Sequence, residues 1–180
     1  MKRRSKARKP MIMNACVLID FIKTDHTVLE LIVKYVGPVY VISPIIEEVD
    51  DINNEPDLQE LGLVIMEPEI EDAYVAAGHS SPISFQDRLC LLTAKRHGST
   101  CVTNDKTLRK LCRQEDVPLL WGLELLAELH KAGGIPGKDA ELIAQAIRDS
   151  NPKHITTKII SRFKNIIQRQ EKQMKKDSFF

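Results

Sequence analysis

Two carboxylates stand where they could bind a metal ion. Asp87 lies in the first turn of a predicted helix that begins at Ser84 and continues through the apolar-periodic residues 89–97. Asp105 follows the short apolar stretch 100–102, which predicts a strand. In an open α/β sheet, ligands and chemistry gather outside the carboxyl ends of the strands. Two acids at that edge indicate a divalent cation, and a cation held by carboxylates indicates chemistry on phosphates.

Two further polar residues occupy the same place in the pattern. Asn14 follows the apolar stretch 11–13, and Glu48 lies in the helix predicted after the β-branched stretch 39–42. If the strands are parallel, these side chains converge with the first two acids at one edge. Two carboxylates about 5 Å apart repel each other by roughly 3 kcal/mol at an effective dielectric near 20. Such a cluster requires a cation or a proton, which again favours a metal site.

Each of these residues also has a structural interpretation. Asp87 completes a capping-box pattern that starts at Ser84, and Asp105 at the start of a helix suits the helix dipole. Glu48 could belong to an exposed acidic helix face, and Asn14 could be a turn residue. Taken one at a time, the structural interpretations of the three acids are the better ones, and only the joint placement favours a site.

Strand and helix patterns alternate from residue 11 to residue 131. The predicted strands cover 11–13, 39–42, 62–66, 101–102 and 117–120. The predicted helices cover 17–22, 27–36, 43–52, 70–77, 84–97, 106–113 and 122–131. This alternation predicts a three-layer α/β/α fold with a central parallel sheet and helices on both faces.

Two appended helices are predicted after the glycine-rich breaker segment 133–137. One covers 139–148, with an apolar stripe at Leu142, Ile143, Ala146 and Ile147. The other carries an apolar face formed by Ile155, Ile159, Ile160, Phe163, Ile166 and Ile167, which predicts either docking on the core or self-association as a dimer. We therefore expect a basic, flexible arm (1–10), an α/β domain (11–131) and a C-terminal helical extension (132–180).

The net charge of +1 conceals a strong division along the chain. Residues 35–87 contain twelve acidic residues and no lysine or arginine, whereas both ends are basic. Basic ends could hold a polyanion by counterion release, with Lys2, Arg3, Arg4, Lys158, Arg162 and Arg169 as candidate nucleic-acid contacts. For the N-terminal arm the alternative is a solvated tail without a partner.

The cysteines and the hydropathy favour a cytoplasmic protein. Cys16, Cys90, Cys101 and Cys112 form no CxxC pair and lie in apolar-periodic segments, which predicts reduced, buried thiols. No segment approaches the roughly 18 apolar residues that a membrane helix needs, so we expect no membrane association. Asn14 and Asp20 interrupt the apolar run near the N-terminus, and no small-residue cleavage site follows, which argues against a signal peptide.

Four segments, in this order and spacing, resemble the PIN-domain nucleases. They are Asn14-Ala15-Cys16-Val17-Leu18-Ile19-Asp20, Ser43-Pro44-Ile45-Ile46-Glu47-Glu48-Val49, Ser84-Phe85-Gln86-Asp87 and Val102-Thr103-Asn104-Asp105. The resemblance covers residues 11–131. Its most specific part is the last two segments together with their spacing.

The resemblance implies a role for each matching residue. Asp87 and Asp105 match the third and fourth family acids, which bind Mg²⁺ or Mn²⁺, and Glu48 matches the second, with Glu47 as the alternative register. The first family acid falls on Asn14, whose amide oxygen can ligate Mg²⁺ but brings no charge. Asp20, Thr103 and Asn104 are secondary site residues; Thr103 could bind a phosphate or a ligand water.

The resemblance further implies a function: metal-dependent hydrolysis of RNA phosphodiesters. Small members of the family are often toxins of toxin–antitoxin pairs, which implies an antitoxin or other protein partner. The alternative is a catalytically weakened PIN domain that binds RNA or protein, which Asn14 and the basic C-terminal helix favour. A phosphotransfer domain is disfavoured because it needs an Asp where Asn14 stands, and a dinucleotide site is disfavoured because no G-x-G-x-x-G follows the first strand.

Overall fold

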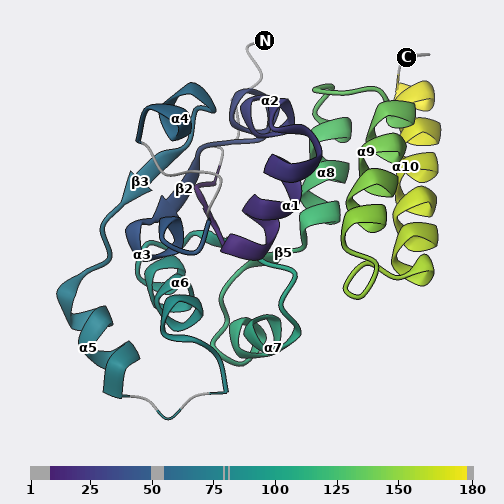
Figure 1. Cartoon of the computed structure of the whole chain (residues 1–180). Coiled ribbons are helices and arrows are strands. Elements are labelled where there is room, and N and C mark those ends of the chain that lie inside the picture. Colours follow the sequence, from purple (N-terminus) through teal and green to yellow (C-terminus); the bar gives the residue numbers. More distant parts are fainter. Residues whose placement is uncertain (1–8, 50–54, 79, 81, 178–180) are drawn as a thin grey trace.

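A parallel sheet forms the centre of the protein (Figure 1). The structure, a computed structural model, describes residues 9–49, 55–78, 80 and 82–177. Within these residues five strands are ordered β3-β2-β1-β4-β5, and every adjacent pair is parallel. They are β1 (Met11–Met13), β2 (Val39–Ile42), β3 (Val64–Met66), β4 (Thr100–Val102) and β5 (Leu119–Leu120). The expected α/β class with a central parallel sheet is confirmed.

The strand order reverses direction beside the central strand, β1. Ile12 of β1 is paired with Tyr40 of β2 on one side and with Cys101 of β4 on the other. The chain builds outward from β1 to β2 and β3, then crosses back to add β4 and β5 on the opposite side. In such a sheet the helices leaving β1 and β4 diverge, and ligands bind between their carboxyl ends.

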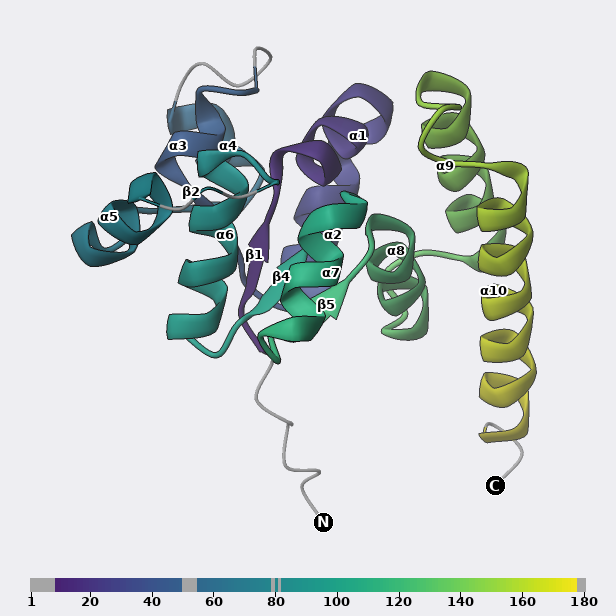
Figure 2. The same cartoon turned by 90° about the horizontal axis from the view of Figure 1, so that it is seen from below.

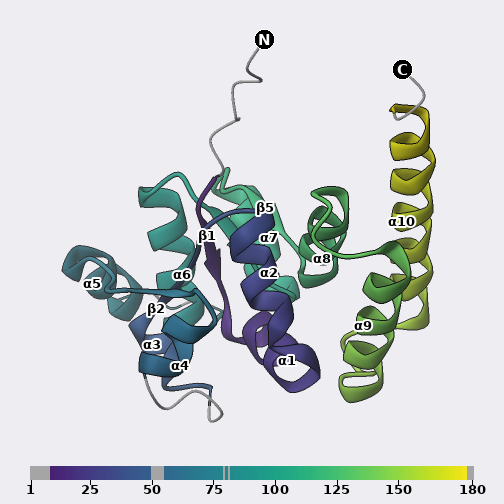
Figure 3. The ribbon, with the colours of Figure 1, turned by 90° about the horizontal axis from the view of Figure 1, so that it is seen from above.

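Helices cover both faces of the sheet: in Figure 1, α2 lies above the sheet and α6 and α7 lie below it, and in Figure 3, seen from above, α2 lies in front of α7. On one face α1 (Ala15–Asp25) and α2 (Thr27–Tyr35) pack together with α8 (Gly122–Lys131). On the other, α6 (Phe85–Arg96) contacts β1, β4 and α7 (Lys106–Gln114). The short helices α3 (Ser43–Ile46), α4 (Glu55–Glu60) and α5 (Ile70–Gly78) complete the connections around β2 and β3. None of the described helices is both long and apolar enough to cross a membrane.

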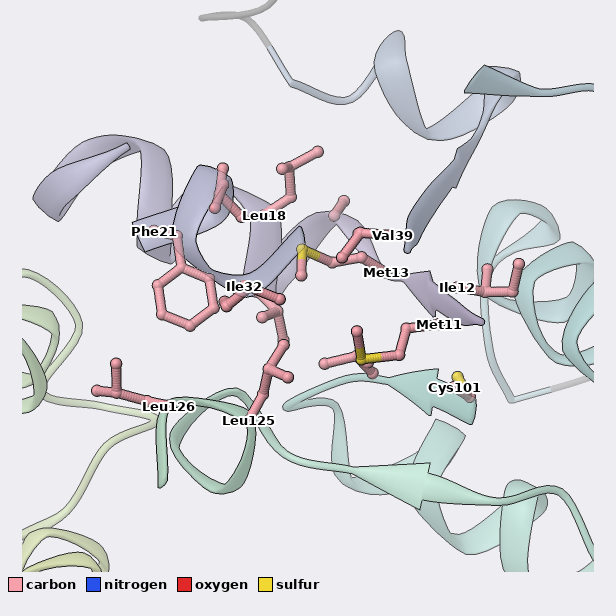
Figure 4. Close-up of a cluster of buried hydrophobic side chains, with 14 of the residues drawn as sticks. Met11, Ile12, Met13, Leu18, Phe21, Ile32, Val39, Cys101, Leu125 and Leu126 are labelled. Carbon is pink, nitrogen blue, oxygen red and sulfur yellow. The ribbon is translucent and has the colours of Figure 1, made fainter. Parts of the chain in front are cut away.

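The pleat of β1 divides the core between these two layers. Met11 and Met13 point toward Phe21, Ile32 and Leu125 of the α1, α2 and α8 layer, as Figure 4 shows, and all five side chains are buried. Ile12 points the opposite way, toward the layer that contains α6. Successive strand residues face opposite sides. The side chain of Asn14, the residue after Met13, therefore points to the side of the sheet that α6 covers.

The two C-terminal helices pack side by side against the domain (Figure 2). They are α9 (Gly137–Ser150), which contacts α1 and α8, and α10 (Thr157–Asp177), which contacts α8 and α9. Ile160, Phe163 and Ile167 of α10 are buried, as is Ile155 just before it. Of the two expectations for this apolar face, docking on the core is therefore observed.

Two local expectations were wrong, and one helix was not expected. Helix α3 ends at Ile46 rather than continuing, because Glu48 and Val49 donate their N–H groups to carbonyls three residues back and close a turn. Residues 50–52 of the expected helix lie outside the described residues. The sequence analysis missed α4, which has no apolar stripe. In α9, Leu142 and Ala146 of the expected stripe are exposed. Ile147 is buried as expected, and Ala140 and Ala144 complete the buried face.

We predict that the docking of α10 contributes to global stability. Phe163→Ala removes a ring that is 2% exposed and should lower the free energy of unfolding by about 3–5 kcal/mol. Leu142→Ala on α9 is the control; it truncates a side chain that is 60% exposed and should change stability by less than about 0.5 kcal/mol. Urea denaturation followed by circular dichroism measures both, and equal losses would show that the extension packs differently.

Candidate functional site

The predicted site residues lie at the carboxyl edge of the sheet, around the crevice between β1 and β4. Asn14 follows β1 directly and caps α1, whereas Asp105 caps α7 three residues after β4 ends. Asp87 lies in the first turn of α6, and Glu48 follows the short helix after β2. Parallel topology thus brings four distant segments to one edge, as the sequence predicted.

Asn14 connects three of the surrounding elements. Its Nδ2 donates a hydrogen bond to Oδ1 of Asp87 at 2.6 Å, which joins the end of β1 to α6. Its Oδ1 accepts from the backbone N–H of Cys16 at 3.3 Å and from the Cys16 thiol at 3.0 Å. The backbone N–H of Asn14 donates to the carbonyl of Val102 in β4 at 2.9 Å. With only 3% of the residue exposed, the amide has a fixed orientation with its N–H₂ toward the carboxylate.

Asp87 does not cap its own helix through its side chain. Ser84 is the N-cap of α6, and its Oγ accepts the backbone N–H of Asp87 at 3.0 Å. The Asp87 carboxylate instead accepts the hydrogen bond from Asn14, and its negative charge affects the pKa of Glu48. Partial desolvation of the carboxyl group, followed by the negative charge of Asp87, raises the pKa of Glu48. The two carboxylates are therefore close enough to interact electrostatically, although Glu48 as a residue is exposed.

Asp105 forms a helix cap. Its Oδ1 accepts the backbone N–H of Leu108 at 2.6 Å, and its own N–H donates to Oγ1 of Thr103 at 3.1 Å. Thr103 is fully buried, and its hydroxyl also lies 3.6 Å from the Cys16 thiol. Thr103 thus positions the loop after β4, and the structural interpretation of Asp105 agrees with its observed contacts.

Asp20 is more central than the sequence indicated. The resemblance gives Asp20 only a secondary role in the site, yet the residue is only 7% exposed. One carboxylate oxygen accepts from Nδ2 of Asn104 at 3.0 Å and the other from Nδ2 of Asn151 at 3.1 Å. Burial raises the pKa of Asp20, and these two hydrogen bonds oppose the shift. Asn104 also accepts the backbone N–H of Gly122 at 3.0 Å, so the network connects β4, α1, α8 and the turn after α9.

A groove of about 610 Å³ opens beside this network. Its lining includes Cys16, Asp20 and Asn104 from the site, together with four basic side chains: Lys106, Arg109, Lys153 and His154. The guanidinium of Arg109 lies 3.8 Å from the ring centre of Trp121, which fixes its position at the groove wall. Sequence reasoning missed this groove because residues 151–154 are far from α7 along the chain and match no motif.

The candidate nucleic-acid contacts are only partly described. Lys2, Arg3 and Arg4 lie outside the described residues. Lys158, Arg162 and Arg169 lie together on α10 and line a shallow surface hollow of about 460 Å³. One of them, Arg162, is also 3.6 Å from the carboxylate of Glu124.

The expected cluster of three acids is not assembled as one metal-binding group. Among the described residues, no set of three or more His, Cys, Asp or Glu side chains is placed to hold a metal ion. The site divides into the interacting pair Glu48 and Asp87 and the separate helix cap Asp105. Mg²⁺ is commonly bound through one or two carboxylates plus water and substrate phosphate, so the chemistry of the pair still suits this ion.

No protein-family model matches the chain, and no curated protein matches it.

The electrostatic pairing of Glu48 with Asp87 can be tested directly. A like charge raises the pKa of an acid, so Asp87→Asn should lower the pKa of Glu48 toward its ordinary value. Asp105→Asn is the matched control and should leave the Glu48 pKa unchanged, because Asp105 is not among the charges that act on Glu48. NMR titration of the Glu48 side-chain carboxyl carbon measures both values. An equal shift in the two variants would mean that Asp105 lies with the pair after all.

Proposed function

We propose that the protein is a PIN-like, metal-dependent endoribonuclease. The observation that carries the proposal is the position of Glu48 and Asp87, which both lie at the carboxyl edge of the sheet beside the point where the strand order reverses. Burial, and then the charge of Asp87, raise the pKa of Glu48. Within the described part of the chain, neither carboxylate has an ion-pair partner. Two acids kept together at neutral pH without a protein cation favour a bound cation instead.

Glu48 and Asp87 are the residues that would hold Mg²⁺ or Mn²⁺. The ion would supply an activated water as nucleophile and stabilise the charge that develops on the departing oxygen. Asn14 holds the Asp87 carboxylate in one orientation through its 2.6 Å hydrogen bond, and Ser84 fixes the helix turn that carries it. Asp105 and Thr103 position the loop on the opposite side of the crevice. The family resemblance extends the proposal to a cytoplasmic toxin restrained by an antitoxin partner.

Cleavage of RNA tests this proposal. The full chain with Mn²⁺ should cleave a single-stranded RNA. The variant Asp87→Asn/Glu48→Gln should reduce the cleavage rate by more than about 100-fold, because removing only a residue that supports a metal ligand already costs up to about 100-fold. The control variant Glu141→Gln/Asp149→Asn removes the same charges from α9 and should retain activity. Calorimetric titration of Mn²⁺ into the same samples separates lost metal binding from lost chemistry.

A second candidate function is a weakened PIN-like domain that binds RNA or protein without cutting. Two contacts favour it: the amide of Asn14 occupies one oxygen of Asp87, and Asp105 is engaged as a helix cap. An amide at this position brings no charge to a metal site.

Substitution of Asn14 separates the two functions. Asn14→Asp places a third carboxylate against Asp87, so without metal the variant should melt at a lower temperature than wild type, and Mn²⁺ should raise its melting temperature more than that of wild type. If the chain is a nuclease, wild type and variant both cleave RNA. If it is a binding module, wild type fails to cleave at any Mn²⁺ concentration and only the variant can gain activity. Asn14→Ala, which removes the Asp87 contact without adding charge, controls for loss of the hydrogen bond.

A further inference from the structure

The groove beside the site has one wall from the α/β domain and one from the C-terminal extension. Cys16 and Ile19 of α1 and the first turn of α7, with Lys106 and Arg109, form the first wall. The turn between α9 and α10 forms the second, with Asn151, Lys153 and His154. The extension therefore contributes basic side chains to a hollow that begins at the carboxyl edge of the sheet.

The turn is fixed firmly enough to serve as a binding wall. Nδ2 of Asn151 donates to Asp20 at 3.1 Å, and the carbonyl of Asn151 accepts the backbone N–H groups of His154 at 3.2 Å and Ile155 at 3.0 Å. Ile155 is buried beneath it. Lys153 and His154 lie between these two anchors and are exposed.

The charges in the groove favour an anionic ligand. The two acids in its lining are engaged internally, Asp20 with two asparagine amides and Asp105 with the backbone of α7. Within the described residues, Lys106 and Lys153 have neither a hydrogen-bond nor an ion-pair partner. Cations of both walls therefore remain available to a ligand that carries negative charge at intervals.

Cys16 links the groove to the candidate site. Its side chain lines the groove, and its thiol donates to Oδ1 of Asn14, which in turn donates through Nδ2 to Asp87. The groove therefore lies next to the buried Asn14–Asp87 hydrogen bond, and the ligand that its spaced cations would suit is an extended polyanion. A single-stranded RNA fits this description because its phosphates repeat along a flexible chain.

We propose that the groove between α7 and the α9–α10 turn binds the phosphodiester backbone of single-stranded RNA, with Lys106 and Arg109 on one wall and Lys153 and His154 of the C-terminal extension on the other. The inference rests on the proposed function for the choice of RNA, but it concerns binding and requires no metal. It gives the extension a role in holding substrate as well as in packing.

Binding without divalent metal tests the groove separately from cleavage. The probe is a fluorescein-labelled single-stranded oligonucleotide, titrated with the full chain in EDTA at several salt concentrations and followed by anisotropy. Lys106→Gln/Lys153→Gln changes one exposed residue on each wall and should weaken binding about tenfold at low salt. It should also reduce the slope of log K against log salt by about 1.4, since each phosphate contact to a single strand contributes about 0.7. The control Lys131→Gln/Lys138→Gln removes the same charge outside the groove, at the C-terminal end of α8 and the N-terminal end of α9, and should leave both quantities unchanged.

Three results would overturn the proposal: unchanged RNA affinity in the groove variant, an equal loss in the control variant, or competition by inorganic phosphate or a mononucleotide as effective as that by RNA. The last result would identify a site for a small phosphate compound. The nuclease proposal fails by a different result, the absence of RNA cleavage by wild type with Mn²⁺. If the groove variant loses RNA binding and wild type does not cleave RNA, the two results together support the RNA-binding groove and the non-catalytic function.

Discussion

The hydrogen bond between Asn14 and Asp87 is the contact on which the arrangement of the carboxyl edge depends. It joins the end of the central strand to the first turn of α6, two segments separated by 73 positions in sequence. The same side chain caps α1 through its oxygen, so one amide sets the start of one helix and the position of another. A carboxylate at this position could accept the Cys16 N–H but could not donate to Asp87. The present chain thus joins these two segments by an interaction that an aspartate would not provide.

Much of the fold follows from local sequence. The apolar stretches 11–13 and 39–42 are strands with those bounds, and the Ser84 cap, the Asp105 cap and the helix from Gly122 to Lys131 lie where their patterns predict. The helix α9 is present as predicted, but its buried face was predicted wrongly in part, because the pattern gives weight to large apolar residues. Its buried face uses Ala140 and Ala144, whose small side chains let it lie close to its neighbours, and Leu142 is left in solvent.

The site was predictable only as a set of positions. Parallel strands bring Asn14, Glu48, Asp87 and Asp105 to one edge, and that much follows from the pattern. Which of them contact each other depends on side-chain orientation. The pattern allowed Asp105 to be either a helix cap or a metal ligand, and its contact with Leu108 is that of a cap, whereas no local pattern indicated that Asp20 would be buried. The contact between Asp20 and Asn151 spans 131 positions and depends on how the extension docks, which no local pattern encodes.

The alternation along β1 couples the core to the site in one further way. Met11 and Met13 fill one layer, Ile12 faces the other, and Asn14 follows on the side of α6. Because side chains alternate with a period of two, a single-residue insertion or deletion within this strand would exchange its two faces. The amide would then turn away from Asp87 at the same time as the methionines left their layer. The length of this short strand is thus constrained both by the packing of the methionines and by the contact of Asn14 with Asp87. An insertion or deletion that preserved the hydrophobic core would need a second, compensating change before Asn14.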